Sequence, residues 1–244
     1  MVLAGCGGRG ASGPPVEVVV VSPRATVLGK DASKPIGAGE IARIRERREV
    51  VNVVPRMELR GRALGAYTFE GQEIKFEVGG FTDGIPASAV EPALAATFVD
   101  LDPASPARPV PALLSPVMVQ LYNQKMADQH DLPRLGPVEL DLAIRSGRLV
   151  FTITLGDSMV PAYRDPPPVT RTIDAVIVGV SPRAKSIGLT VPIGYVAAWN
   201  RELVGNHAAG NHSSLVVTLR DGASLKPFTA WIENELELEL ESTP

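Results

Sequence analysis

The chain has 244 residues, a formal net charge of −3 and a 45% share of apolar residues. This length supports one large domain or two small ones with a substantial core. The scattered basic residues exclude the electrostatic footprint of a nucleic-acid-binding protein. Cys6 is the sole cysteine, which excludes disulfides within the chain and cysteine-based metal cages. No apolar stretch approaches the roughly 20 residues that span a bilayer.

The chain opens with the pattern that ends a bacterial lipoprotein signal. Residues 3–6 read Leu-Ala-Gly-Cys: a small residue precedes the cleaved bond, and the cysteine thiol takes the lipid. A complete signal also has a basic start and an apolar run of about 7–15 residues, whereas five residues precede Cys6 here. This implies either that the start codon was placed too late or that the sequence was trimmed. We expect a lipid anchor on Cys6, on the periplasmic side of a bacterial membrane; the alternative is a cytoplasmic protein with a chance cysteine.

The first part of the chain predicts a tether and then alternating strands and helices. Residues 7–15 are mostly Gly, Ser and Pro, which is typical of a flexible linker. The elements expected next are a strand at 16–22, a helix at 39–48, a strand at 50–59 and a hairpin with strands at 64–69 and 73–78. Pro55 lies inside the second strand, where it favours an edge position or a bulge.

The middle of the chain has a different composition. Residues 82–112 are rich in Pro, Ala and Asp, and a helix is expected at 115–128, with Ser115 as its N-cap and Pro116 at its first position. The broad apolar face of this helix includes Leu121, Tyr122 and Met126. These three side chains are our candidates for contact with a ligand or partner, and the alternative is simple packing under the inserted part. Strands at 148–155 and 172–180 follow.

The last part repeats the pattern of the first. A strand at 189–191 leads through Pro192 into a helix to about residue 203; a strand at 214–219, a helix at about 224–232 and a final strand with alternating Glu and Leu follow. These elements predict an α+β fold in which a sheet from both ends of the chain encloses an inserted mixed α/β subdomain. The expected parts are a tether at 1–15, a first subdomain from 16–81 plus 187–242, and an inserted subdomain at 82–186.

Several short strings, taken together with this organisation, resemble one family. They are residues 49–55, 111–116, 121–124, 155–158, 175–180, 188–192 and 213–217. The chain resembles, over residues 16–240, the periplasmic core domain of MacB/FtsX-type ABC transporter permeases. The resemblance implies that the first subdomain is a porter-like strand–helix–strand part, in a domain that passes ATP-driven motion to substrates or partners.

This sequence has neither the flanking membrane helices nor the ATPase of that family. We therefore expect a free-standing copy that binds or docks without pumping, as a membrane-tethered envelope scaffold and an accessory to such a transporter. Neither catalysis nor a cofactor is expected. A fragment or a relic of a permease is the alternative.

The strongest enzymatic alternative is an SGNH-like esterase that uses Ser158. A strand at 151–155 leads into Gly-Asp-Ser, which resembles the way that those esterases present their nucleophile. The partner histidine should follow an aspartate by about three residues, but Val204 and Ala209 stand three residues before His207 and His212. Acyl transfer needs the base and its orienting group as a unit, so a turn is the simpler interpretation. The same two histidines lack the third ligand of a zinc site, and we expect a polar loop and no metal.

Overall fold

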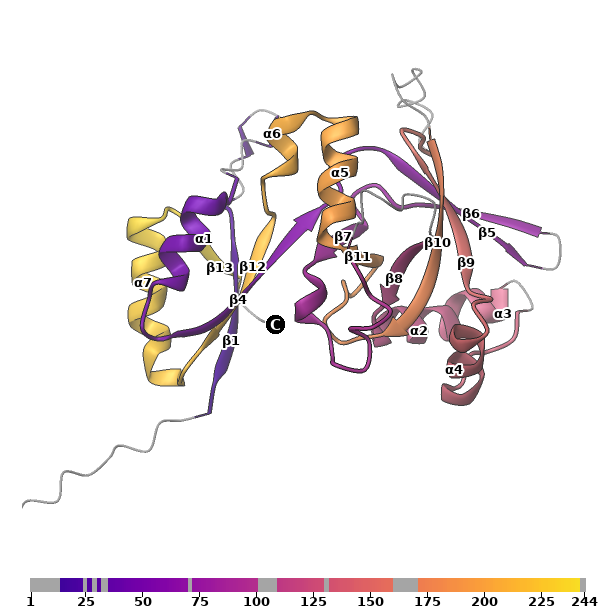
Figure 1. The fold of residues 1–244 in the computed structure, drawn as a ribbon, viewed down its shortest axis with the longest axis horizontal. Coiled ribbons are helices and arrows are strands. Elements are labelled where there is room, and N and C mark those ends of the chain that lie inside the picture. Colours follow the sequence, from indigo (N-terminus) through magenta and orange to yellow (C-terminus); the bar gives the residue numbers. More distant parts are fainter. Residues whose placement is uncertain are drawn as a thin grey trace, which may run out of the picture. The chain divides into compact units, whose positions relative to one another are not determined.

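The computed structural model describes residues 14–23, 26–27, 30–31, 35–69, 72–100, 109–129, 132–159 and 171–241. Two compact units divide the chain: unit 1 contains residues 1–53 and 214–244, and unit 2 contains residues 54–213. Figure 1 follows the elements of each unit along the sequence. Cys6, most of the expected tether and the side chain of Met126 lie outside the described residues.

Unit 1 is built from the two ends of the chain. Its elements are β1 (Val16–Val21), β2 (Thr26–Val27), β3 (Lys30–Asp31), α1 (Ala38–Arg45), the start of β4 (Val50–Glu58), β12 (Ser214–Leu219), a 3-10 turn (Gly222–Ser224), α7 (Leu225–Glu235) and β13 (Glu239–Glu241). β1 pairs antiparallel with β12 on one side and with β13 on the other. The first expected strand and the strand at 214–219 are therefore direct neighbours.

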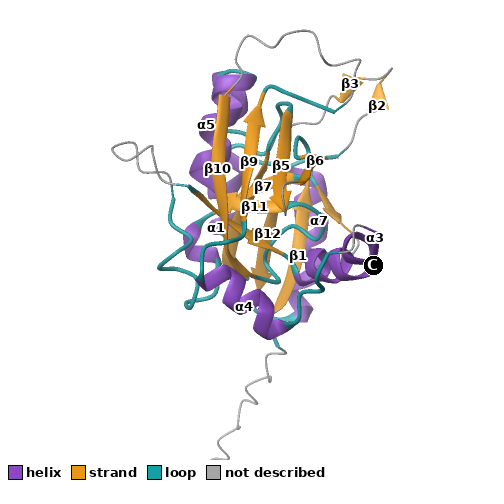
Figure 2. Cartoon of the chain, turned by 90° about the vertical axis from the view of Figure 1, so that its right-hand side faces the viewer, coloured by secondary structure: helices purple, strands orange, loops and turns teal. Residues whose placement is uncertain are grey.

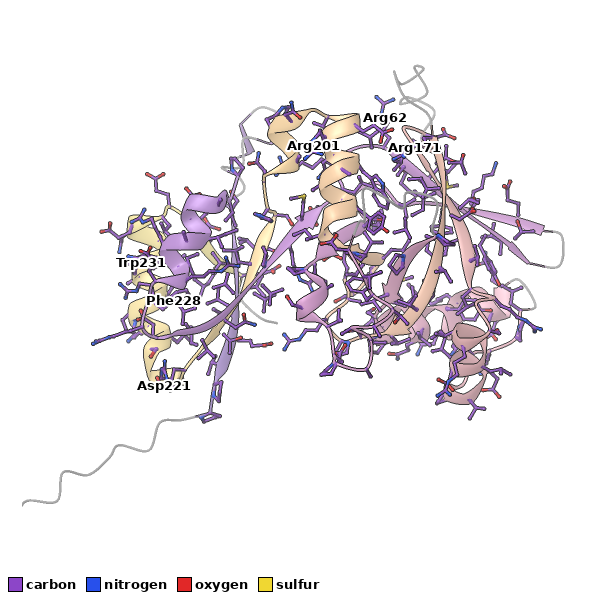
Figure 3. All side chains as sticks on the ribbon, in the orientation of Figure 1. Arg62, Arg171, Arg201, Asp221, Phe228 and Trp231 are labelled. Atoms are coloured by element: carbon purple, nitrogen blue, oxygen red, sulfur yellow. The ribbon has the colours of Figure 1, made fainter. Side chains whose placement is uncertain are left out.

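Helices α1 and α7 pack on the sheet of unit 1 through one apolar stripe each. Ile41 and Ile44 of α1 and Phe228 and Ile232 of α7 are buried with the inward side chains of β1 and β12. The outer side of α7 carries Trp231, whose ring lies 4.7 Å from the Arg47 guanidinium carbon. Figure 3 shows Phe228 and Trp231 on this helix. The alternation of apolar and polar residues in these segments fixes which face is buried.

Unit 2 contains the rest of the chain. Its elements are the end of β4, β5 (Ala63–Phe69), β6 (Gln72–Glu77), β7 (Thr82–Ile85), a 3-10 turn (Ala87–Ala89), β8 (Val110–Leu114), α2 (Pro116–Leu121), the π-helix η2 (Tyr122–Met126), α3 (Ala127–Gln129), α4 (Pro137–Arg145), β9 (Val150–Leu155), β10 (Arg171–Val180), β11 (Leu189–Pro192), α5 (Ile193–Leu203) and α6 (Asn206–Ala209). Among the described residues of this unit, no helix has the length and hydrophobicity needed to cross a membrane.

The strands of unit 2 form a mixed sheet in the order β4-β7-β11-β8-β10-β9-β5-β6. The pairs β7/β11 and β8/β10 are parallel, and the β5/β6 hairpin forms one edge. Helix α5 contributes Tyr195, Val196 and Trp199 to the core of this unit. Figure 2 shows β10, β9 and β5 side by side, as their pairing requires. The expected α+β class is confirmed.

The limits of the units differ from the expected subdomains. The compact units meet at 53/54 and 213/214, whereas the subdomains expected from the sequence meet at 81/82 and 186/187; that division stays a prediction. The reason for the difference is strand pairing, since β5 pairs with β9 and β7 pairs with β11, which draws residues 54–81 and 187–213 into unit 2. Pro55 stands next to the first boundary, and Met57 and Glu58, which follow it, pair with Gly84 and Asp83 of β7.

Most expected elements are present, and several differences are found. β2, β3, β7, β8, α4 and α6 are not among the expected elements, and α6 replaces part of the polar loop expected around His207. β8 is a short buried strand that begins Val-Pro, and α4 follows Gly136, which is its N-cap with extended backbone. The expected final strand is shortened to Glu239–Glu241, because Glu237 has a φ of 55° that interrupts extended backbone. Leu236 and Leu238 are nevertheless buried as the alternation predicted.

Candidate partner-binding surface

Six of the large apolar side chains that are exposed among the described residues of unit 2 stand on segments that hydrogen bonds join to one another. These residues are Phe81, Val117, Leu121, Val138, Leu142 and Ile187, and their exposed fractions range from 37% to 75%. We call this set the apolar surface. It comes from the turn before β7, helices α2 and α4, and the loop at 181–188. Grouped exposed apolar side chains are typical of an interaction site.

Helix α2 contributes Val117 and Leu121, which are four residues apart and therefore on one side of the helix. As predicted, Ser115 is the N-cap and Pro116 the first helical residue. Ser115 Oγ accepts a hydrogen bond of 3.0 Å from the N–H of Met118 and donates one of 2.7 Å to the carbonyl oxygen of Ser186. The cap therefore fixes the helix to the loop that carries Ile187.

The π-helix η2 directly follows α2, and its polar side chains hold the segment that precedes α4. Tyr122 Oη donates to the carbonyl oxygen of Pro133 at 3.0 Å. Asn123 accepts from the N–H of Leu135 at 2.7 Å and donates to the carbonyl oxygen of the same residue at 2.9 Å. Single π-helical turns occur frequently at functional sites. These bonds connect the end of α2 to the segment before α4. Figure 1 shows both helices beside α3.

The three side chains expected to make ligand or partner contacts have separate positions. Leu121 is exposed and belongs to the apolar surface. Tyr122 is half-buried and its hydroxyl is used as an anchor; burial, and then the nearby Tyr67, raise the pKa of Tyr122 above 10.0, so the hydroxyl remains a donor at neutral pH. The side chain of Met126 lies outside the described residues. The assignment of these residues to partner contact stays a prediction.

Helix α4 presents the most exposed apolar pair. Val138 and Leu142 are four residues apart with exposed fractions of 75% and 67%, whereas Leu140 is buried. Ile144 packs against the core of unit 2. The helix is therefore apolar on the side that it buries and also on one side that it leaves open. The sequence signal for this feature was the Gly136-Pro137 helix start followed by apolar residues at 138, 140, 142 and 144.

Ser158 lies in a turn after β9 and points inward. The residue is 4% exposed, and its Oγ donates to Glu77 Oε2 at 3.0 Å. The same carboxylate oxygen accepts from the N–H of Met159, and Asp157 Oδ1 accepts from the N–H of Ser158. Such a hydroxyl stabilises a turn and is shielded from a substrate, as the simpler interpretation of this motif implied.

The two histidines of the loop after α5 do not share an element. His207 lies exposed in α6, and His212 follows in the segment before β12. Within the described part of the chain, no group of three or more His, Cys, Asp or Glu side chains is arranged to hold a metal ion.

A buried ion pair in unit 2 was not anticipated from the sequence. Arg56 Nη1 lies 3.0 Å from Asp83 Oδ2, and the Asp83 side chain is almost fully enclosed. Asp83 follows Phe81 and Thr82 in a short segment whose composition favoured a loop. One sequence signal for a strand at this position is that β-branched residues, Thr82 and Ile85, flank Asp83 and Gly84.

Comparisons with known proteins give distant likenesses in structure. No family model matches the chain, and no curated protein matches it. The extracellular domain of the noncanonic ABC-type transporter YknZ from Gram-positive bacteria matches with a TM-score of 0.42 at 10% identity, over 93% of this chain and 100% of that one. The periplasmic region of MacB from Actinobacillus actinomycetemcomitans matches with a TM-score of 0.43 at 10% identity, over 93% and 88%.

A domain of a protein described as a permease, from Porphyromonas gingivalis, matches with a TM-score of 0.36 at 17% identity, over 93% of this chain and 89% of that one. The chain is similar to domains of transporter permeases. The periplasmic region of MacB, whose family the sequence strings resemble, is among the matched structures.

Proposed function

We propose that this protein is a non-enzymatic binding or scaffolding protein of the bacterial cell envelope, and that the apolar surface of unit 2 is its partner contact. The observation that carries the proposal is the exposure of six large apolar side chains on linked segments of one unit. Burying a Val, Leu, Ile or Phe side chain is worth roughly 1.5–3 kcal/mol. A partner that covers several of these side chains would therefore gain substantial affinity.

The contacts beneath this surface support a preformed binding face. Ser115 and Asn123 join α2 to the loop at 181–188 and to the segment before α4. The apolar side chains therefore stand on segments that are already held in place, and binding need not order them. Preorganisation of this kind lowers the entropic cost of association.

The partner in this proposal is an ABC transporter complex in the same membrane. The support is the set of seven sequence strings that resemble a permease domain. In this role, unit 1 would correspond to the porter-like part of that family and unit 2 would carry the contact.

The membrane attachment in this proposal is a lipid on Cys6, exposed on the periplasmic side. Two or more acyl chains would anchor the protein stably, because each buried methylene adds roughly 0.8 kcal/mol. We expect the protein, expressed from its own upstream DNA in a bacterial host, to incorporate a clickable palmitate analogue and to sediment with membranes. Cys6→Ser should lose both properties. Labelling that persists in Cys6→Ser, or a wild-type protein that stays unlabelled, would contradict the anchor.

The partner contact is tested with a photo-crosslinking amino acid at Val138 in intact membranes. We expect an adduct with an envelope protein, identified by mass spectrometry, that disappears when Leu142→Asp is added. The same crosslinker at Val51, which is equally apolar and 58% exposed but belongs to unit 1, is the matched control. Equal adducts from both positions, or adducts that Leu142→Asp leaves unchanged, would sink the assignment of this surface.

A further inference from the structure

A network of charged and polar side chains in unit 2 centres on the carboxylate of Asp83. This residue is 2% exposed. Asp83 Oδ2 is paired with Arg56 Nη1 at 3.0 Å, and Asp83 Oδ1 accepts a hydrogen bond of 2.5 Å from Thr190 Oγ1. The three residues come from β7, β4 and β11. A buried carboxylate with a single guanidinium partner depends strongly on that partner.

Side chains of this network contact the loop at 181–188 at residues 183 and 185. Arg56 Nη2 donates to the carbonyl oxygen of Arg183. Thr190 Oγ1 accepts from the N–H of Lys185 at 2.7 Å, and Lys185 Nζ is 2.6 Å from Glu58 Oε1. The loop has no helical or strand structure of its own. Backbone bonding fixes its start, where the N–H of Ser181 donates to the carbonyl oxygen of Leu114. Residues 183 and 185 are held by the side chains of Arg56 and Thr190, and both of these side chains also contact Asp83.

The same loop reaches the apolar surface on its other side. The carbonyl oxygen of Ser186 accepts the hydrogen bond from Ser115 Oγ, the N-cap of α2. Ile187, which follows, is 52% exposed and is a member of the apolar surface. A continuous series of bonded groups thus leads from the Asp83 carboxylate through residues 183–186 to α2.

We propose that Asp83 is a positioning residue whose protonation releases the loop at 181–188 and so changes the apolar surface at Ile187 and at the cap of α2. In the held state, the ionised carboxylate keeps Arg56 turned inward, where the guanidinium binds Arg183. A neutral Asp83 offers no countercharge, and Arg56, whose side chain is already 20% exposed, turns to solvent and gives up the Arg183 carbonyl. The consequence for partner binding rests on the proposed function, whereas the movement of the loop does not.

The direction of the effect follows from the groups that face Asp83. Burial raises the pKa of Asp83 above 3.8, and Glu58 adds to this, while Arg56, Thr190 and Lys185 act to lower it. In the proposed released state the loop moves while the carboxyl stays enclosed by the strands. The attraction of Arg56 is then lost without a gain of solvation, so the pKa of the carboxyl is higher there than in the held state. The state that binds the proton more tightly is favoured by acid. Acidification therefore favours release.

The loop can be followed with a nitroxide spin label on Ile187→Cys in the full chain. Cys6→Ser removes the sole native cysteine, so that the label occupies one position. We expect the label to become more mobile on acidification, with a midpoint above pH 3.8, while circular dichroism shows that the fold persists. A label on Val204→Cys, an exposed apolar position of the same unit, should show no such transition.

Three variants separate titration of Asp83 from a merely structural role. Asp83→Asn should give the mobile spectrum at every pH. Thr190→Val should move the midpoint to higher pH, because it removes a hydrogen bond that favours the ionised form, and Glu58→Gln should move it to lower pH, because it removes a like charge while the amide oxygen can still accept the bond from Lys185 Nζ. Asp174→Asn, at an exposed position of β10, is the control and should leave the midpoint unchanged.

The proposal is overturned if the label shows no transition before global unfolding, or if Thr190→Val and Glu58→Gln shift the midpoint in the same direction. Should Asp83→Asn fail to fold, the opposed shifts of the other two variants still decide the matter. Because the label reports on the protein alone, a loop that moves without any effect on the Val138 crosslink would leave the switch standing and count against the proposed partner contact.

Discussion

Ser115 and Ser186 are joined by a hydrogen bond of 2.7 Å from the hydroxyl of the first to the carbonyl oxygen of the second. Ser115 is almost fully buried and also caps α2 through the N–H of Met118. One hydroxyl thus serves the helix and the loop at 181–188 together. This relationship couples two segments that are 71 residues apart in the chain.

Removal of the Ser115 hydroxyl should lower the free energy of unfolding by more than the loss of an ordinary helix cap does. Ser115→Ala is expected to lower the free energy of unfolding by about 1–2 kcal/mol, because the helix loses its cap and the Ser186 carbonyl loses a partner. Chemical denaturation measures the change. Ser146→Ala, which removes an exposed hydroxyl bonded only locally to the Ala143 carbonyl, serves as the comparison and should stay within about 0.5 kcal/mol of wild type. Equal effects would contradict the coupling.

Gly188 stands where no other residue fits. Its φ is +126°, and a Cβ built on it would lie 1.7 Å from the carbonyl oxygen of Phe81. Gly188→Ala should therefore destabilise the protein by about 3 kcal/mol, through backbone strain and a forced shift of the strand start. Gly210→Ala is the matched substitution, since Gly210 has negative φ and open space around it. A melting experiment in which both variants behave alike would refute this account.

The free energy of unfolding should depend on pH through the titration of the Asp83 carboxyl. Its pKa is raised in the folded state above the ordinary 3.8, chiefly by burial. The folded state therefore holds the proton more tightly, and the stability contributed by the protonated group is present below pH 3.8 and lost as pH rises through the folded-state pKa. Relative to Asp83→Asn, wild type should lose stability over that interval. Denaturant titrations of both proteins at several pH values measure the free energy of unfolding of wild type minus that of Asp83→Asn. This quantity should fall as pH rises, and a rise with pH would contradict the account.

The two sides of α4 should respond differently to truncation. Leu140→Ala removes a buried side chain and should cost about 2–5 kcal/mol. Leu142→Ala removes an exposed one and should change stability by no more than about 0.5 kcal/mol. Thermal unfolding of the pair provides the measurement. A large loss from Leu142→Ala would mean that this side chain is part of the core and is not available to a partner.

Ser158 is expected to be structural. Wild type and Ser158→Ala should both fail to hydrolyse p-nitrophenyl esters above background, since the hydroxyl is enclosed and donates to Glu77. The substitution should instead lower the free energy of unfolding by about 1 kcal/mol through loss of that hydrogen bond. Ester hydrolysis by wild type that Ser158→Ala abolishes would establish the esterase alternative.

Elements that depend on interactions between residues close together in the chain could be predicted from the sequence. The strand at 214–219 and the capped start of α2 at Ser115 and Pro116 are examples. In both, the deciding interactions are local: alternation places one side chain in two toward the core, and the cap satisfies an N–H three residues away.

The unit boundaries and the exposed side of α4 could not be read in this way. Whether β5 and β7 belong with the ends of the chain depends on their pairing with β9 and β11. Nothing in residues 63–69 or 82–85 encodes a partner about a hundred residues away. Likewise, Leu140 and Leu142 are the same residue type two positions apart, and only the packing of α4 decides which of them is buried.

The sequence by itself determined the α+β class, the elements of both ends of the chain and the lipoprotein-type pattern at Cys6, because periodicity, caps and motifs are properties of neighbouring residues. Tertiary structure alone decided that Asp83 is enclosed beside Arg56, and that six apolar side chains remain exposed on joined segments. Burial and charge pairing arise between segments that are distant in the chain, and they exist only once those segments have packed.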